Sequence, residues 1–263
     1  MAGLSDEELD RYARHLVLRE VGGAGQAKLR AARVLVVGAG GLGSPAALYL
    51  AAAGVGTLGL IDDDTVSLSN LQRQILFRST DVGRPKVEAG AQALHALNPG
   101  VKLVTHPVRM TTHNVMDVIA GYDVVADGSD NFPTRFLLGD ACFFAGKPLV
   151  SAAVTEFEGQ LATWKAYSAR GALPCHRCLF PAPPPPGSVP NCSEAGVMGA
   201  ATGVMGALQA LEVIKEITAI GTSLAGKLLV YEALAARFRT ISVPPDPACA
   251  LCGSAATLHD FLK

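Results

Sequence analysis

The sequence predicts an α/β protein built on a Rossmann-like, doubly wound sheet, mixed parallel and antiparallel, with a zinc site of four cysteines. Residues 33–61 run in the order strand, glycine turn, helix and strand, which is the opening βαβ unit of such a sheet. Two Cys-x-x-Cys pairs stand far apart in the chain. A length of 263 residues, 49% of them apolar, supplies one large core, so we expect residues 1–263 to form a single domain.

The remaining elements are predicted from apolar runs and their bounding residues. Ser5 and Glu8 form a capping box that opens a helix over residues 5–16. Apolar runs between turn residues predict the strands, and longer amphipathic stretches predict the helices. The expected strands are 33–37, 57–61, 101–104, 124–126, 149–151 and 161–164, and the expected helices are 44–53, 85–97 and 134–145. We expect the later strands to be antiparallel.

Two stretches in the second half need separate explanations. Residues 181–190 are so rich in proline that they cannot hold a helix or a central strand, so we expect an exposed, extended loop that leads into Cys192. Residues 195–211 are almost free of charge, as a membrane span would be. They are slightly too short for one, and their side chains are small, which favours a helix buried in the protein or at a subunit contact.

Composition and charge exclude several classes of protein. The formal net charge is -1 and the isoelectric point is near 6.6, and no run of lysine and arginine could follow a phosphate backbone, so we expect no direct binding of nucleic acid. No charged leader with an apolar core opens the chain. With cysteine pairs of the zinc type, this indicates a protein of the reducing cytoplasm that is not bound to a membrane.

The cysteine pairs predict a structural metal site. Cys175 and Cys178, with Cys249 and Cys252, can place four thiolates around one Zn²⁺ ion, which leaves no open position for a substrate. The predicted zinc turn, the proline-rich loop and the loop of Cys192 together occupy about residues 175–195. His176 could also ligate, although four thiolates make it unnecessary. The alternative is a pair of disulfides or unrelated buried thiols.

The glycine turn predicts a nucleotide site. Gly38, Gly40 and Gly43 permit a tight turn and a close approach of backbone N–H groups to phosphate at the start of a helix. Asp62 follows at the end of the second strand, where it suits the hydroxyl groups of a ribose. These features alone fit an NAD-dependent dehydrogenase equally well.

The next charged residues favour ATP over a dinucleotide. Arg73 and Lys86 could supply cations for a triphosphate, and Asp130, after the strand at 124–126, could hold Mg²⁺. Ligands of open α/β sheets bind at the carboxyl ends of the strands, where Asp130 is expected. The alternative is that Arg73 and Lys86 form surface ion pairs and that Asp130 caps the following helix.

Several motifs together resemble the ThiF/MoeB/HesA family of ubiquitin-activating-like adenylyltransferases over essentially the whole chain. The most discriminating is Ser67-Leu-Ser-Asn-Leu-Gln-Arg-Gln74. The others are Arg11-Tyr-Ala-Arg14, residues 38–43, Asp62, Lys86, residues 127–131, both cysteine pairs and Cys192-Ser-Glu-Ala-Gly-Val. The resemblance implies ATP-dependent adenylation of the C-terminal Gly-Gly of a small ubiquitin-like sulfur-carrier protein, in thiamine, molybdopterin or thiolated tRNA synthesis.

The resemblance also implies residue roles. Gly41 belongs to the phosphate turn and Asp62 binds the ribose, while Asp130 holds Mg²⁺. Asn70, Arg73 and Lys86 contact the phosphates. Arg14 reaches the phosphates from the second subunit of a homodimer, or else it is a solvated charge on the first helix.

Cys192 and the sulfur source complete the predictions. In ThiF-like relatives the cysteine that matches Cys192 becomes linked to the activated carrier, whereas in MoeB-like relatives it is dispensable, so a covalent role and a packing role both stay open. The chain ends soon after Cys252, so we expect no appended sulfurtransferase domain and expect sulfur from another protein, such as a cysteine desulfurase. An ATP-dependent tRNA-adenosine dehydratase shares the nucleotide motifs, and a noncatalytic binding module is a further alternative.

Overall fold

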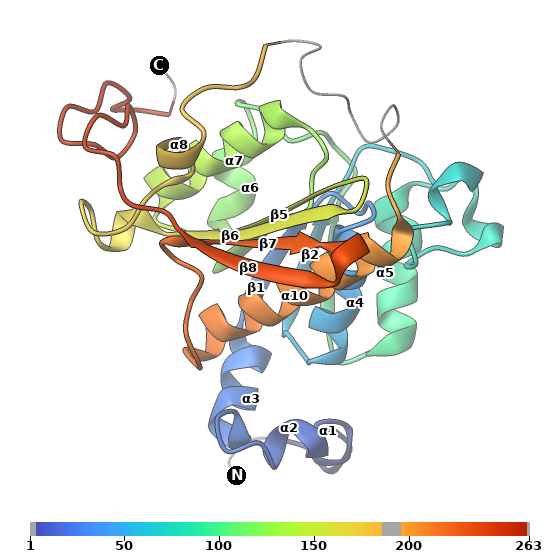
Figure 1. Cartoon of the computed structure of the whole chain (residues 1–263). Helices are drawn as coiled ribbons and strands as arrows, with labels where there is room; N and C mark the ends of the chain where they lie inside the picture. The colour runs from blue at the N-terminus through green and yellow to red at the C-terminus, as the bar shows by residue number, and fades with distance from the viewer. Residues whose placement is uncertain (1–3, 186–195, 262–263) are drawn as a thin grey trace.

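A single eight-stranded sheet organises the computed structural model, which describes residues 4–185 and 196–261 (Figure 1). Its strand order is β3-β2-β1-β4-β5-β6-β7-β8. The strands are β1 (Arg33–Val37), β2 (Thr57–Ile61), β3 (Lys102–His106), β4 (Val124–Asp127), β5 (Leu149–Thr155), β6 (Glu158–Trp164), β7 (Lys227–Glu232) and β8 (Arg237–Ser242). Pairing is parallel from β3 to β5 and antiparallel from β5 to β8, which confirms the predicted mixed sheet.

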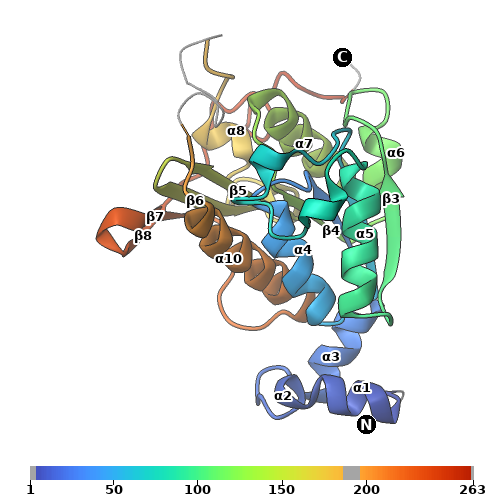
Figure 2. The ribbon, with the colours of Figure 1, turned by 90° about the vertical axis from the view of Figure 1, so that its right-hand side faces the viewer.

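Helices cover both faces of the parallel half. They are α1 (Asp6–Arg11), α2 (Ala13–Leu16), α3 (Gly22–Ala31), α4 (Gly43–Ala52), α5 (Lys86–Leu97), α6 (Val115–Ala120), α7 (Phe132–Ala145), α8 (His176–Leu179) and α10 (Gly199–Thr218). Helices α4, α5 and α10 pack on one face, and α6 and α7 pack on the other (Figures 1 and 2). Because the side chains of β1 alternate between the two cores, four of its five residues are buried, and the strand is an unbroken apolar run.

The strand order creates a crevice at the end of β1. From β1 the chain passes through α4 to β2 on one side, and it later returns to β4 on the other side. Such a reversal separates the loops that leave two neighbouring strands and forms a site outside their carboxyl ends. The glycine turn follows β1 and residues 128–131 follow β4, so both reach this crevice.

The predicted helix over residues 5–16 is wrong in one respect, because the chain turns at Tyr12 and forms α1 and α2. The capping box is present, with Ser5 N–H donating to Glu8 Oε2 at 2.8 Å. Tyr12 is 5% exposed, and its hydroxyl accepts a hydrogen bond from Asn98 Nδ2 at 2.9 Å. Burying this ring interrupts the helix, a tertiary effect that overrides local propensity.

Other elements were extended or missed by the prediction. Strands β5 and β6 reach residues 155 and 158 because they form one hairpin, whose two halves pair over their whole length. The prediction omitted α3, α6, β7 and β8. Four of the ten residues of α3 are glycine or glutamine, at positions 22, 23, 25 and 26, which gives it almost no apolar stripe. Packing of Leu29 and Gln26 stabilises it instead.

The nearly uncharged segment forms the buried helix α10. An added Cβ at Gly206 would lie 2.4 Å from Pro45 Cγ, so the two helices α10 and α4 pack in close contact. Gln209 Nε2 donates to the carbonyls of Asp127 and Val150, at 2.8 and 3.0 Å, and joins α10 to the sheet. Among the helices that the structure describes, none has the length and apolar character to cross a membrane.

Candidate nucleotide site and cysteine cluster

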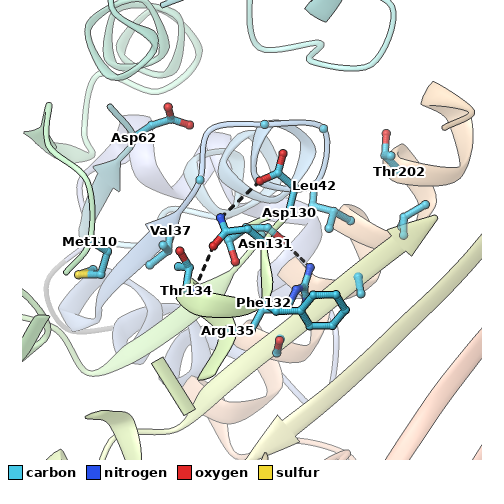
Figure 3. Close-up of a pocket in the computed structure, with 18 of the residues that line it drawn as sticks. Val37, Leu42, Asp62, Met110, Asp130, Asn131, Phe132, Thr134, Arg135 and Thr202 are labelled. Carbon is cyan, nitrogen blue, oxygen red and sulfur yellow. Dashed lines mark hydrogen bonds between the residues drawn. The ribbon is translucent and has the colours of Figure 1, made fainter. Parts of the chain in front are cut away.

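A pocket of about 750 Å³ lies at the carboxyl ends of β1, β2 and β4. The glycine turn, Asp62, Arg73, Lys86 and Asp130 all line it, so the structure brings together residues that are widely spaced in the sequence. Figure 3 shows Asp62 after β2, Asp130 before α7 and Thr202 on α10 around the same cavity. The pocket lies outside the strand ends, where the sequence analysis expects the site, and its binding of a nucleotide stays a prediction.

The glycine turn is tight enough to exclude side chains at two positions. Gly38 has a positive φ of 84°, and its N–H donates to the carbonyl of Ile61 at 2.9 Å. A Cβ on Gly43 would lie 1.8 Å from the carbonyl oxygen of Gly38. Gly40 and Gly41 line the pocket just before α4 begins, so the helix presents its N-terminal dipole end to this cavity.

Replacing Gly43 with alanine is expected to lower the free energy of unfolding by about 1–3 kcal/mol, since the new methyl group forces the backbone of the turn apart. Urea denaturation measures this change. The matched control is Gly203→Ala, because a Cβ at Gly203 on α10 meets no atom within 4 Å. Equal stability of the two variants would contradict the close packing of the turn.

Asp62 supports the turn from the end of β2. Its Oδ2 accepts a hydrogen bond from Ala39 N–H at 2.8 Å, and its Oδ1 accepts one from Asp64 N–H at 2.9 Å. Burial raises the pKa of Asp62, while the ammonium of Lys86 and these two hydrogen bonds oppose the shift. The hydrogen bond from Ala39 therefore holds the Asp62 carboxylate against the glycine turn, in the wall of the pocket.

Lys86 forms ion pairs with nearby acids, as the alternative expected, but its side chain is buried and does not lie at the surface. The residue is 5% exposed, and its Nζ lies 2.7 Å from Asp64 Oδ2 and 3.8 Å from Asp62 Oδ1. An ammonium ion loses its hydration when it is buried and needs anions nearby. Facing the pocket, Lys86 is placed to attract a further anionic ligand.

Arg73 and Asn70 share one turn but take different positions. The Arg73 guanidinium donates to the carbonyl of Ser69 at 3.1 Å, and its methylene groups pack over Gly41, within 3.3 Å of the place of an added Cβ. Asn70 does not line the pocket, and its Oδ1 accepts a hydrogen bond from Ser67 N–H at 3.2 Å. Asn70 shapes the turn that carries Arg73, and its contact with phosphate stays a prediction.

Asp130 points into the cavity from an exposed position before α7. The alternative that it caps this helix is wrong, because Asn131 is the N-cap and accepts a hydrogen bond from Thr134 N–H at 3.0 Å. Arg135 holds the loop by donating to the carbonyls of Ser129 and Ala152. A fixed loop therefore presents the Asp130 carboxylate, whose hydrogen-bond partner among the described residues is Asn131 Nδ2 at 3.5 Å.

Some pocket residues were missed in the sequence. Arg135 lies on α7, four positions after Asn131, the last residue of the motif at 127–131. The helical period could therefore have placed it on the same side as Asn131. Gln74 ends the motif at residues 67–74, but the sequence analysis assigned it no role. Thr202 comes from α10, and no local pattern connects that helix with the glycine turn.

Arg14 is not part of this pocket in the same chain. It is exposed on α2, in the N-terminal helices that project below the sheet (Figure 2). The pocket is lined by residues at the starts of α4 and α7 and does not include Arg14. Cys192 lies outside the described residues.

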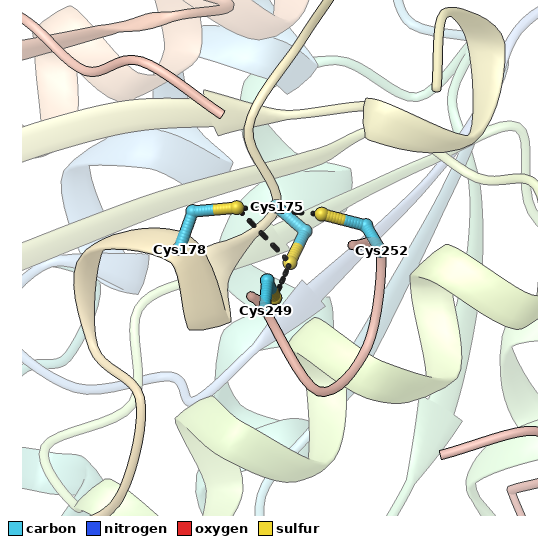
Figure 4. Close-up of side chains that lie close together, drawn as sticks. All are labelled: Cys175, Cys178, Cys249 and Cys252. Carbon is cyan, nitrogen blue, oxygen red and sulfur yellow. Dashed lines mark hydrogen bonds between the residues drawn. The ribbon is translucent and has the colours of Figure 1, made fainter. Parts of the chain in front are cut away.

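The four paired cysteines form one cluster (Figure 4). Their sulfur atoms all lie within 4.8 Å of one another, with 3.5 Å between Cys175 and Cys249 and 3.3 Å between Cys178 and Cys252. All four are free thiols, so the disulfide alternative is wrong. A tetrahedral zinc site with Zn–S bonds of about 2.3 Å needs sulfur atoms about 3.8 Å apart, which this donor set fits.

The two halves of the cluster come from α8 and from the turn after β8. The guanidinium of Arg177 makes a bidentate ion pair with Asp140 on α7, with both N–O distances 2.7 Å. Burial and the neighbouring sulfur of Cys178 raise the pKa of Cys252 to about 12. His176 points away from the sulfurs, into the rings of Phe136 and Trp164, and its burial lowers its pKa to about 4.

The comparisons agree with these features. The model of the ThiF family matches residues 12–251. The chain is 49% identical to the sulfur carrier protein adenylyltransferase of Thermus thermophilus, over 97% of this chain and 95% of that protein. It is 48% identical to the SAMP-activating enzyme E1 of Haloferax volcanii, over 95% and 91% of the two chains.

Longer and more distant relatives share the fold. The adenylyltransferase and sulfurtransferase MOCS3 of Bos taurus is 51% identical over 99% of this chain, which spans only 56% of that protein. The crystal structure of E. coli MccB superposes with a TM-score of 0.81 at 23% identity, over 98% of this chain and 76% of MccB, a likeness of fold. The match of the family model over most of the chain, together with these close relatives, shows that the protein belongs to the ThiF family.

Proposed function

We propose that the protein uses ATP to adenylate the C-terminal glycine carboxylate of a small ubiquitin-like sulfur-carrier protein, with release of pyrophosphate. The observation that carries this proposal is a pocket of the described residues in which a glycine turn meets two cations, Arg73 and Lys86, and the exposed carboxylate of Asp130. The close similarity to proteins named sulfur carrier protein adenylyltransferase and SAMP-activating enzyme E1 supports the choice of reaction.

The chemistry needs alignment and charge neutralisation. A C-terminal carboxylate is already ionised at neutral pH, so no general base has to activate it. Its oxygen attacks the α-phosphorus of ATP, the new C–O–P linkage forms, and the bond to pyrophosphate breaks. Both reactants are anions, and the protein must hold them in line and stabilise the charge that develops on the phosphates.

Each pocket residue takes one part of that work. The glycine turn and the N-terminal end of α4 receive the phosphates, with Arg73 and Lys86 as charged donors. Asp62, beside the turn, binds the ribose. Asp130 holds Mg²⁺, whose preferred ligands are carboxylate and phosphate oxygens, and this ion supplies charge neutralisation when bound. The cysteine cluster holds a structural Zn²⁺.

The two enzymatic alternatives are not favoured. A dehydrogenase needs one pyrophosphate cradled mainly by backbone, which gives Lys86, beyond its ion pairs with Asp62 and Asp64, and the pocket-lining Asp130 no part in binding the ligand. A tRNA-adenosine dehydratase is not among the close relatives named above. Sulfur for the activated carrier comes from a separate donor, such as a cysteine desulfurase. We place the reaction in the cytoplasm, where thiols such as the free cysteines stay reduced.

Pyrophosphate exchange tests the proposal. The protein is incubated with ATP, Mg²⁺, labelled pyrophosphate and purified carriers of thiamine, molybdopterin and tRNA-thiolation pathways, each ending in Gly-Gly. We expect label to enter ATP only when an accepted carrier is present, and a carrier truncated by its last glycine to be inert. Oxidation of a nicotinamide without such exchange would contradict the proposal.

A homodimer completes the site. Arg14 is exposed beside the exposed apolar side chains of Val17 and Leu18, which are 76% and 49% exposed, and it lies apart from the pocket of its own chain. An exposed cation flanked by apolar residues suits an isologous contact in which each Arg14 enters the partner's pocket. A monomer would then lack one phosphate contact.

Mixed dimers test this arrangement. Arg14→Ala and Asp130→Asn chains carrying different tags are expected to be nearly inactive alone. Coexpressed, half of the dimers are mixed, and each mixed dimer has one intact site of two, so adenylation recovers to about a quarter of the wild-type rate. Mixed dimers that form and stay as inactive as either parent would show that Arg14 does not act across the interface.

A further inference from the structure

A buried carboxylate lies behind the wall of the pocket, at the end of β4. Asp127 is the last residue of that strand, and its side chain is 0% exposed and does not line the pocket. Burial strips a carboxylate of its hydration, which is unfavourable unless hydrogen bonds and a nearby cation replace the water. The partners of Asp127 therefore show what this side chain holds in place.

The carboxylate is bonded to three parts of the pocket wall. Its Oδ1 accepts hydrogen bonds from Ser129 N–H at 3.0 Å and from Ser129 Oγ at 2.6 Å. Its Oδ2 accepts one from Ser151 Oγ, on β5, at 2.9 Å, and lies 3.9 Å from Arg135 Nη1, on α7. Ser129, Ser151 and Arg135 all line the pocket. Asp127 thus joins the loop after β4, strand β5 and helix α7 at one point.

The loop held by these bonds is the one that presents Asp130. Ser129 is held from both sides, because Arg135 also donates to its carbonyl oxygen. The residue before it, Gly128, packs on the glycine turn, since an added Cβ there would lie 2.9 Å from the amide nitrogen of Gly43. Asp130 follows Ser129 directly in the chain. The position of the Asp130 carboxylate relative to the glycine turn therefore depends on Ser129 and on the buried carboxylate behind it.

We propose that Asp127 is a positioning residue for adenylation, which holds Ser129 so that the carboxylate of Asp130 is placed to bind Mg²⁺ on the phosphates of ATP. This inference rests on the proposed function and concerns a residue that touches neither substrate. Mg²⁺ demands near-ideal octahedral geometry, so a small displacement of one ligand weakens its binding. A displacement of about 1 Å in an active site can lower the rate by on the order of 100-fold.

The substitution Asp127→Asn tests this role. It keeps the volume of the side chain but leaves one acceptor oxygen in place of two. The bonds to Ser129 and Ser151 then cannot both be kept as they stand, and Arg135 loses a counter-ion. We expect carrier adenylation to slow by roughly 10- to 100-fold and to need more Mg²⁺ for its half-maximal rate. Titration calorimetry should show unchanged binding of ATP without Mg²⁺, and loss of the gain in ATP affinity that Mg²⁺ gives the wild type.

A double substitution separates positioning from support of the fold. If Asp127 acts through the carboxylate of Asp130, then adding Asp127→Asn to the Asp130→Asn enzyme removes little more, and pyrophosphate exchange should slow by less than about twofold. A residue that only stabilises the fold would slow both enzymes by the same factor. An equal fall in the two backgrounds would therefore overturn the inference.

Glu212 provides the matched control, because it is also a buried and hydrogen-bonded carboxylate. It is 2% exposed on α10, and its Oε1 accepts hydrogen bonds from Thr163 Oγ1 at 2.9 Å and from Leu224 N–H at 2.7 Å. Neither Glu212 nor these two partners line the pocket. Glu212→Gln should lower the melting temperature, as Asp127→Asn does, and leave the Mg²⁺ dependence of exchange unchanged.

Melting temperature without ligand reports whether each variant is folded. Where Asp127→Asn is unfolded, Ser129→Ala serves, since it removes the 2.6 Å bond and leaves the carboxylate in place. We expect it to slow adenylation by roughly 2- to 10-fold with the same change in Mg²⁺ dependence. Folded variants with the wild-type rate and the wild-type Mg²⁺ dependence would overturn the inference while the proposed function stands. A wild type that adenylates no carrier would overturn both.

Discussion

Replacing Asp130 with asparagine is expected to lower the rate of carrier adenylation by roughly 10²- to 10³-fold, the usual effect of losing one preorganised electrostatic group. The change removes the negative charge that would bind Mg²⁺ and keeps the shape of the side chain. Because Asp130 is exposed and Asn131, not Asp130, caps α7, the fold should be unaffected. Carrier-dependent pyrophosphate exchange at several Mg²⁺ concentrations measures the effect.

The control for this variant is Asp117→Asn, which removes an exposed carboxylate from α6, outside the pocket. It should exchange pyrophosphate at the wild-type rate. If Asp130→Asn keeps both the wild-type rate and the wild-type dependence on Mg²⁺, the assignment of the metal to this carboxylate is wrong. Binding of ATP in the absence of Mg²⁺ should be nearly equal in the two variants.

Loss of one cysteine from the cluster is expected to have the second large effect, on stability. Cys249→Ser removes one of four ligands, and a structural zinc site contributes its binding free energy directly to folding. The cluster joins α8 to the segment after β8 and is packed with Phe143 and Leu251. We expect zinc content to fall from one ion per chain, the melting temperature to drop by several degrees or more, and residues 244–261 to become sensitive to protease.

Cys142→Ala is the matched control for the cysteine substitution. Cys142 is 1% exposed and lies in a different core cluster, so its loss should lower stability modestly and leave the zinc content unchanged. A chelator should destabilise the wild type and Cys142→Ala, and should have little further effect on Cys249→Ser. Wild-type protein that contains no metal would contradict a structural zinc site. So would a melting temperature that neither Cys249→Ser nor the chelator changes.

The parts that were predictable from the sequence are those in which local pattern and tertiary structure agree. The glycine turn between Arg33–Val37 and α4 needs no distant residue to be recognised, since Gly38 and Gly43 have no substitute at their positions. The single cluster formed by the two cysteine pairs was also predictable, because two Cys-x-x-Cys pairs in one chain are typical of a metal site. These motifs fixed the location of the pocket and of the cluster.

The remaining features depend on contacts between distant segments. The break at Tyr12 exists because its ring packs against Gly54 and bonds to Asn98, neither of which is near it in sequence. Strand β7 pairs with β6 of the hairpin and β8 pairs with β7, and the residues of β8 are exposed, so no buried apolar face marks that strand. Thr202 lies 3.4 Å from the place of a Cβ on Gly41 because α10 packs on α4, a contact between segments far apart in the sequence.

Intact-mass spectrometry of the carrier tests the central claim most directly. A purified Gly-Gly carrier is incubated with the enzyme, ATP and Mg²⁺ together with pyrophosphatase, and the reaction is quenched in acid, which preserves the acyl-adenylate. We predict that an accepted carrier gains the mass of one adenylyl group on its last residue, and that with Asp130→Asn enzyme it gains this mass at least about 100-fold more slowly. Carriers of all three pathways that stay unmodified, while ATP remains intact, would contradict the account.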